Sequence, residues 1–444
     1  MKNLEKNKKG SLRWLVLTSL SILLTFGMIS CDSMVEVVDP DIVTPESLNS
    51  ETGIQTLKAG SLGDLSIAIS GAAAGHGATT GLIVMSGLMS DEYDYSGTFP
   101  TRREGDTRIL QNTNGDITRI YGNLHKARAG AEATVDLAVN FGGLPDVESE
   151  MQSIIGYSYV FFAETFCGAV PFSKVPSDGG DIIYGMPLST EQMFTDAITW
   201  FDQALANSSG NTELTNLARV GKARALLGLG QINAAANEVA SVPDDFVYNI
   251  EHSVNSRRQE NGIYIMSTVR RQFSIADGKG GNGLMYRSSG DPRTPWNGGT
   301  LFGQDDITLY YNQLKYTSSD ASVILASGIE ARLIEAEAAA NSDDISNVQT
   351  IHNALRATLS LPALDLTGLS GDALMLAHMK ERAYWLFSTG HRHGDLNRLV
   401  DIYGMPPSSV FPWGSYFKGG EYSSTLRFPV PQSESNNPNY VECL

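Results

Sequence analysis

Two histidines and an aspartate lie close together in residues 387–399, which read FSTGHRHGDLNRL. They are His391, His393 and Asp395. Imidazole and carboxylate groups bind zinc and related metals, and the same groups transfer protons in enzymes. A metal site would require all three side chains to converge on one cation, with further hydrogen bonds to orient the imidazoles.

The neighbouring arginines argue against a metal, because Arg392 and Arg398 would repel a cation. Charged residues around a helix end are ordinarily caps and ion pairs. We therefore expect Gly390 to end one helix, Asp395 to cap the next through its carboxylate, and the arginines to pair with carboxylates such as Glu381. On this interpretation the segment is structural, and the sequence predicts no metal site.

Other catalytic and cofactor motifs are weak or missing. Residues 71–81 read GAAAGHGATTG, but their glycines lack the GxGxxG spacing and no βαβ pattern surrounds them. Neither G-x-S-x-G nor H-E-x-x-H occurs in the chain, so the signal for hydrolysis is poor. We predict no catalytic residues, no cofactor and no enzymatic activity.

The N-terminus has the layout of a secretory signal. A basic start leads into the apolar run WLVLTSLSILLTFGMIS, and Cys31 follows. Because Gly27–Ser30 and Cys31 resemble a bacterial lipobox, we expect residues 1–30 to be a lipoprotein signal peptide and Cys31 to carry the lipid. An ordinary cleaved signal is the alternative. Residues 31–50 are acidic and rich in Pro and Ser, which favours an extended tether.

The chain is strongly acidic, with a formal net charge of −17 at pH 7. Residues 1–30 carry five basic side chains and one acidic side chain, so the chain that starts at Cys31 carries −21. Binding to nucleic acid depends on clustered Lys and Arg that neutralise phosphates. We therefore expect no nucleic-acid partner, and favour partners that are neutral or basic.

Two cysteines remain after Cys31, namely Cys167 and Cys443. In an exported chain a disulfide between them is permitted, and two unpaired thiols are the alternative. Closing so long a loop would stabilise the fold by roughly 5 kcal/mol in the chain-entropy model.

Apolar residues at helical spacing predict a mainly helical, all-α fold. Residues 190–210 have one apolar face, with Thr190 placed to cap the start. Two Ala-rich stretches follow, separated by Gly228 and Gly230; such small residues let short helices approach closely, as in tetratricopeptide repeats. Further helices are expected at 53–70, 116–140, 149–166, 320–341, 345–357 and 371–389.

No Pro- or Gly-rich linker clearly divides the chain, so we expect a single domain over residues 51–444. Residues 243–320 differ from the rest, because much of this region is rich in Gly, Asn, Asp and aromatic residues without a helical period. We interpret it as a loop-rich insert. A long loop region inside a helical chain is more often functional than idle.

Several motifs in chain order resemble those of the SusD/RagB-like nutrient-binding outer-membrane lipoproteins. They are FFAETFCGAVPFSKV at 161–175, GDPR at 290–293, ARLIEAEAAA at 331–340 with HNALRA at 352–357, KERAYWLFSTGHRHGDLNRL at 380–399, and FPVPQSESNNPN at 428–439. The likeness covers essentially the whole chain. Cys167, Phe387 and Thr389 depart from the usual residues, which indicates a divergent member.

The resemblance implies a helical fold of tetratricopeptide-like pairs with a loop-rich ligand-binding face. It also implies a lipid-anchored, surface-exposed outer-membrane protein. Such a protein captures a glycan or peptide nutrient and delivers it to a SusC-type TonB-dependent outer-membrane transporter.

Ligand contacts in similar proteins come from an early acidic-to-arginine loop and from aromatics in the middle loops. Aromatic faces stack on sugar rings, while carboxylates and arginines bind hydroxyls. By position, the matching residues here are Asp91, Glu92, Tyr93, Arg102, Arg103, Trp296, Tyr310 and Tyr311, with Trp413 and Tyr416 as a weaker third candidate. The alternative is that these side chains pack the loops.

Two other functions stay open at this point. One is a secreted hydrolase that acts on the same nutrient. The other is a helical-repeat scaffold that binds no small molecule.

Overall fold

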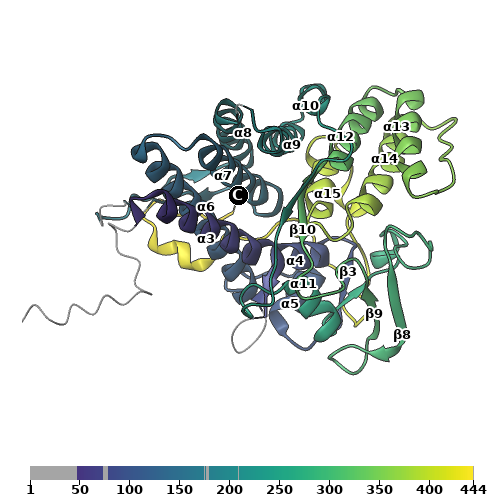
Figure 1. Cartoon of the computed structure of the whole chain (residues 1–444). Coiled ribbons are helices and arrows are strands. Elements are labelled where there is room, and N and C mark those ends of the chain that lie inside the picture. Colours follow the sequence, from purple (N-terminus) through teal and green to yellow (C-terminus); the bar gives the residue numbers. More distant parts are fainter. Residues whose placement is uncertain (1–47, 74–78, 175, 177–179, 209, 444) are drawn as a thin grey trace, which may run out of the picture. The chain divides into compact units, whose positions relative to one another are not determined.

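The computed structural model describes residues 48–73, 79–174, 176, 180–208 and 210–443 (Figure 1). The expected signal peptide, the lipidation site Cys31 and most of the tether lie outside these residues, as does the centre of the Gly-rich segment at 71–81. Among the residues that are described, no helix is both long and apolar enough to cross a membrane.

Helices dominate the described chain, which confirms the predicted mainly helical fold (Figure 1). In the first half, each helix packs on the next one in the following list, from α3 to α10. These helices are α3 (Glu51–Ser70), α6 (Gly115–Phe141), α7 (Pro145–Thr165), α8 (Thr190–Asn207), α9 (Thr212–Gly228) and α10 (Ile232–Val239).

Small residues let these helices approach closely. Gly156 of α7 and Gly221 of α9 both face the ring of Phe201 on α8, where a Cβ atom would clash with the ring. Gly228 faces Phe194 in the same way. Because these glycines have no side chain, the aromatic rings of α8 pack directly on the backbone of α7 and α9. The helices of the scaffold can therefore lie close together in pairs.

The second half of the scaffold consists of α12 (Gly328–Asn341), α13 (Ile345–Thr358), α14 (Gly371–Trp385) and α15 (Arg392–Asp401). Two predicted boundaries are wrong here. The helix expected from residue 320 begins at Gly328, because residues before it form β10 (Val323–Ser327), which pairs with β6 (Val247–Ile250). The helix expected to reach residue 389 ends at Trp385, before the turn that leads to α15.

The cap of α8 is also one residue earlier than predicted. Ser189, not Thr190, accepts a hydrogen bond from the backbone N–H of Gln192 at 3.2 Å. The Gln192 side chain accepts in return from the Ser189 N–H at 2.8 Å, which completes a capping box.

The helices α4 (Leu82–Met89) and α5 (Pro100–Thr107) have no counterpart in the sequence prediction. α4 is buried on every side, so it has no amphipathic period to detect. α5 is short and polar, with Pro100 at its first turn. Together they carry the early loop that was expected to bind ligand.

The region at 243–320 contains short regular elements as well as loops. Besides β6 they are α11 (Gly262–Tyr264), a π-helical turn (Ile265–Val269), β7 (Phe273–Ile275), a 3-10 turn (Lys279–Gly281), β8 (Trp296–Phe302) and β9 (Leu309–Gln313). β8 and β9 form an antiparallel hairpin, and β7 pairs with β3 (Tyr93–Tyr95). The remaining elements are β1 (Gly71–Ala72), β2 (Thr79–Thr80), β4 (Val170–Pro171), β5 (Pro187–Leu188), α16 (Pro407–Val410) and a 3-10 turn (Gln432–Asn436).

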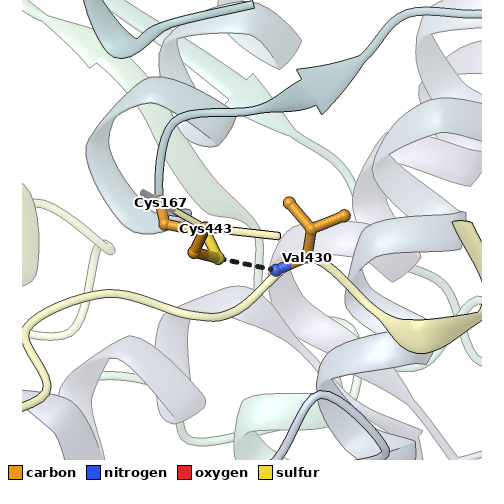
Figure 2. Close-up of a disulfide and its surroundings, with 3 residues drawn as sticks. All are labelled: Cys167, Val430 and Cys443. Carbon is orange, nitrogen blue, oxygen red and sulfur yellow. Dashed lines mark hydrogen bonds between the residues drawn. A yellow bond between two sulfur atoms is a disulfide. The ribbon is translucent and has the colours of Figure 1, made fainter. Parts of the chain in front are cut away.

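Cys167 and Cys443 form a disulfide, with Cα atoms 5.7 Å apart and a sequence separation of 276 (Figure 2). Close by, the Cys167 N–H donates to the carbonyl of Phe428 at 2.9 Å, and the Val430 N–H lies 3.4 Å from the Cys443 sulfur. The disulfide and these bonds therefore fasten the C-terminal segment to the end of α7.

Candidate functional site

The two histidines of the 387–399 segment have separate partners and do not converge. His391 Nε2 lies 3.0 Å from a Glu330 oxygen and 2.9 Å from an Arg224 nitrogen. His393 Nε2 instead donates to the carbonyl of Leu426 at 2.6 Å. Burial lowers the pKa of His391, and it lowers the pKa of His393 to about 3, so both imidazoles are neutral at pH 7. Among the described residues, no group of three or more His, Cys, Asp or Glu side chains is placed to hold a metal.

Asp395 is not the helix cap that we predicted. It lies inside the first turn of α15, where both of its oxygens are 3.0 Å from Arg382 Nε and one is 2.9 Å from Arg398 Nη2. Burial alone would raise the pKa of this carboxyl, but the two guanidinium groups lower it overall.

The arginines pair with carboxylates as expected, but not with Glu381. Arg392 binds both oxygens of Asp91 at 2.7 and 2.9 Å, and Arg398 binds both oxygens of Glu337 at 2.7 and 2.9 Å. Glu381 instead accepts from Arg293 and Arg356. These buried pairs join α12, α14 and α15 to the turn after α4, so the segment is a structural junction.

The early acidic loop lies in the core. Asp91, Glu92 and Tyr93 are 0, 1 and 0% exposed. Besides Arg392, Asp91 accepts from the Leu284 N–H at 2.8 Å; Glu92 accepts from the Ser388 N–H at 2.7 Å. The Tyr93 hydroxyl lies 2.6 Å from Ser388 Oγ. With no accessible surface, these side chains anchor the turn between α4 and β3 rather than face a ligand.

Two further residues of the predicted set are also buried. Arg102 contacts Gln272 and lies 3.5 Å from Asp116, and it is stacked near the ring of Phe99. Tyr310 donates its hydroxyl to the carbonyl of Ser267 at 2.6 Å. The sequence alone did not distinguish these loop-packing residues from surface residues, because both groups consist of the same residue types.

Trp296 and Tyr311, in contrast, lie on the surface of the β8–β9 hairpin. Trp296 is 37% exposed, and its ring centroid is 5.5 Å from that of Tyr311 in an edge-to-face arrangement. The guanidinium of Arg287 lies 3.6 Å from the Tyr311 ring centroid, while Trp296 Nε1 donates to the carbonyl of Arg287 at 3.2 Å. Gly298 and Gly299 approach β9 so closely that a Cβ atom would clash with it; Tyr311 is partly buried, with Arg287 over its ring.

Asp94 is a half-buried carboxylate that the sequence prediction missed. It forms no hydrogen bond or ion pair with any described residue, although Lys279, Arg287 and Lys418 are close enough for their charges to lower its pKa. Burial outweighs these charges and raises the pKa of Asp94 to about 6. A carboxylate with this freedom can accept hydrogen bonds from a ligand.

The groups around Asp94 are firmly held. Lys279 Nζ donates to Asp106 at 2.5 Å and to the carbonyls of Leu88 and Tyr93, each at 2.7 Å. The Tyr416 hydroxyl donates to the other Asp106 oxygen at 2.8 Å. Because Asp106 is satisfied by these partners, Asp94 is the carboxylate left accessible here.

Two more candidate side chains lie on the surface. Arg103 is exposed, with its guanidinium 5.9 Å from the ring of Tyr416. Trp413 is 38% exposed and lies 5.7 Å from the Arg108 guanidinium.

We refer to Trp296, Tyr311, Arg287 and Asp94 as the hairpin site.

Solved structures share this fold at low sequence identity. A SusD-like carbohydrate binding protein from Bacteroides vulgatus matches with a TM-score of 0.65 and 12% identity, over 88% of this chain and 97% of that one. A laminarin binding SusD-like protein matches with a TM-score of 0.64 and 13% identity, over 89% and 99%. Surface glycan-binding protein A from Bacteroides uniformis matches with a TM-score of 0.62 and 12% identity, over 89% and 99%.

No family model matches the sequence, and no curated relative does. The structural matches confirm the fold that the motifs implied: the chain has the SusD-like fold, with a sequence far from those of the matched proteins.

Proposed function

We propose that this protein is a cell-surface lipoprotein that captures an oligosaccharide through the hairpin site. The observation that carries the proposal is the pair of exposed Trp296 and partly buried Tyr311, beside Arg287 and the unpaired Asp94 carboxylate. The matched proteins support it, since three of them are described as binding carbohydrate, laminarin or glycan.

The four side chains supply the two kinds of contact that a sugar requires. Trp296 and the part of the Tyr311 ring that Arg287 does not cover offer apolar area for the C–H side of a pyranose ring. Arg287 donates hydrogen bonds, and Asp94 accepts them, so a pair of neighbouring hydroxyls is satisfied from both sides.

Binding at this site involves no covalent chemistry. A glycosidase needs two carboxyl groups that flank the scissile bond. Asp106, whose charge acts on Asp94, is fully buried against Lys279 and Tyr416 and is not available as the second group. This arrangement favours a binding protein over a hydrolase.

Delivery of the captured nutrient is the second part of the proposal. The lipid on Cys31 would hold the protein at the outer membrane, and a SusC-type TonB-dependent transporter would receive the cargo. The SusD-like fold supports this role, because the motifs of the chain resemble those of proteins that work with such transporters. Copurification of the transporter encoded beside this gene is expected; its consistent absence would contradict the delivery role.

A glycan array tests the capture role. The full chain should bind a restricted set of oligosaccharides, and the double variant Trp296→Ala/Tyr311→Ala should lose them. Tyr184→Ala is the matched control, because Tyr184 is an exposed aromatic (44%) that belongs to a different loop. Turnover of any glycan would favour the hydrolase, whereas absence of binding to all glycans would favour the scaffold.

A further inference from the structure

A second cleft lies between α3 and the segment that follows β6, with a volume of about 780 Å³. It shares no residue with the hairpin site. Ligand pockets in proteins are roughly 300–1,000 Å³, so the size is suitable for a small saccharide. One wall is the surface of α3 from Ala59 to Ile67, and the other is formed by residues 249–259; Figure 1 shows α3 and its neighbour α6.

The α3 wall carries two glycines that packing does not require. A Cβ atom on Gly60 or Gly63 would meet no atom within 4 Å. Glycine inside a helix costs about 1 kcal/mol relative to alanine, so both positions weaken α3 without a gain in packing. Their effect is a flat wall of bare helix backbone along the cleft.

The opposite wall is held in place across the floor of the cleft. His252 is 9% exposed, and its two ring nitrogens lie 3.3 Å from Ser66 Oγ and 3.1 Å from Ser70 Oγ. Burial lowers the pKa of His252, so it is neutral and acts as a fixed hydrogen-bonding group. The Ser253 N–H donates to the carbonyl of Gln259 at 3.0 Å and closes the loop. The cleft is therefore formed before any ligand arrives.

The rim combines charged donors and acceptors in equal number. Asp64 lies 3.0 Å from Lys126 Nζ and 2.7 Å from Arg258 Nη2, and Glu251 is the second carboxylate of the lining. Lys126 and Arg258 are more than half exposed, and exposed pairs of this kind contribute only about 0–1 kcal/mol. A ligand can therefore replace these ion pairs with its own hydrogen bonds at a small cost in free energy.

These features favour a neutral, hydroxylated ligand. A hydroxyl donates one hydrogen bond and accepts others, which suits a rim with both kinds of group and no net charge. Leu62, Ile67 and Ile250 supply apolar area below the rim, and the glycine wall leaves room for a flat ring. We propose that this cleft is a second saccharide site, which binds a neutral glycan unit independently of the hairpin site.

Filling the cleft provides the test. Gly60→Leu and Gly63→Leu place a side chain into open space and replace glycine with a better helix former, so their thermal midpoints should equal or exceed that of the wild type. Gly122→Leu on α6 is the matched control, because a Cβ there also meets nothing within 4 Å and Gly122 does not line the cleft.

The readout is hydrogen exchange of the full chain with maltotriose, cellotriose, laminaritriose, trigalacturonic acid and trialanine, each titrated separately. At least one neutral trisaccharide should slow exchange in residues 59–67 and 249–259. Gly63→Leu should weaken this effect by about tenfold or more, which corresponds to a loss of about 1.4 kcal/mol, while Gly122→Leu and Trp296→Ala should leave it unchanged.

Three results would overturn the proposal. They are protection confined to the hairpin site, protection that survives Gly63→Leu, and protection by trigalacturonic acid or trialanine alone. The first of these would leave the capture role of the hairpin site intact. Conversely, protection of the cleft alone, unchanged by Trp296→Ala, would support this site and contradict the hairpin site.

Discussion

Arg392→Ala should destabilise the protein strongly, because it removes one half of a buried ion pair. Arg392 on α15 binds both Asp91 oxygens, at 2.7 and 2.9 Å, and the two side chains are 7 and 0% exposed. Removing one partner of a buried pair leaves an uncompensated charge and costs about 3–5 kcal/mol. Asp91 would keep its hydrogen bond from the Leu284 N–H but would lose the two charged N–H donors of Arg392.

The double variant Asp91→Asn/Arg392→Met separates the charge from the packing. It removes both charges and keeps similar volume, and such replacements are often neutral or stabilising. The asparagine oxygen can still accept from the Leu284 N–H. We therefore expect the double variant to recover at least about half of the loss seen in Arg392→Ala.

Urea unfolding at pH 7, followed by circular dichroism, measures both variants. Lys222→Ala is the control. Lys222 pairs with Asp202 and Glu238, which are 54 and 19% exposed, and because both carboxylates reach solvent the variant should lose about 1 kcal/mol or less. A loss below about 1 kcal/mol for Arg392→Ala, or a double variant as unstable as the single one, would refute the reasoning.

Three other predictions concern single groups. Burial raises the pKa of Glu92 to about 8, above its value in the unfolded chain, so the contribution of Glu92 to stability should fall as the pH rises from about 4.5 to 8. Glu92→Gln should flatten this pH dependence in unfolding titrations. Glu92→Ala should destabilise the protein by about 1–3 kcal/mol, because the Ser388 N–H loses its acceptor. Cys167→Ser should lower the free energy of unfolding by up to about 5 kcal/mol, with little further effect of added reductant; equal stability of the wild type with and without reductant would contradict this. Because the pKa of Asp94 is raised to about 6, glycan affinity should fall as the pH drops from 7 to 5, and Asp94→Asn should remove that dependence; an unchanged pH profile in the variant would exclude Asp94 from the site.

Sequence patterns predicted several scaffold helices well, because these helices have one buried face. α8 shows this most clearly, with Met193, Phe194, Ala197 and Phe201 buried at helical spacing. α4 was missed for the opposite reason, since it is buried all round and has no periodic pattern. The sequence predicted helix where β10 forms, because the partner strand of β10, β6, lies far away in sequence.

The candidate site was harder to predict, because tertiary contacts decide which polar residues reach the surface. Asp91 looked like a ligand contact until its partner Arg392, 301 positions away, was placed beside it. Asp94, three residues later, is the one that remains accessible, yet nothing in its local sequence distinguishes it. Trp296 was predictable as a candidate because an aromatic residue among glycines and polar residues is typical of an exposed loop.

Calorimetric titration of the full chain with an oligosaccharide that it binds on the array is the most direct test of capture at the hairpin. The account predicts that Trp296→Ala weakens binding by about tenfold or more, because each aromatic face contributes on the order of 1 kcal/mol or more to stacking, while Tyr184→Ala binds as the wild type does. Unchanged affinity in folded Trp296→Ala and Tyr311→Ala variants would contradict it.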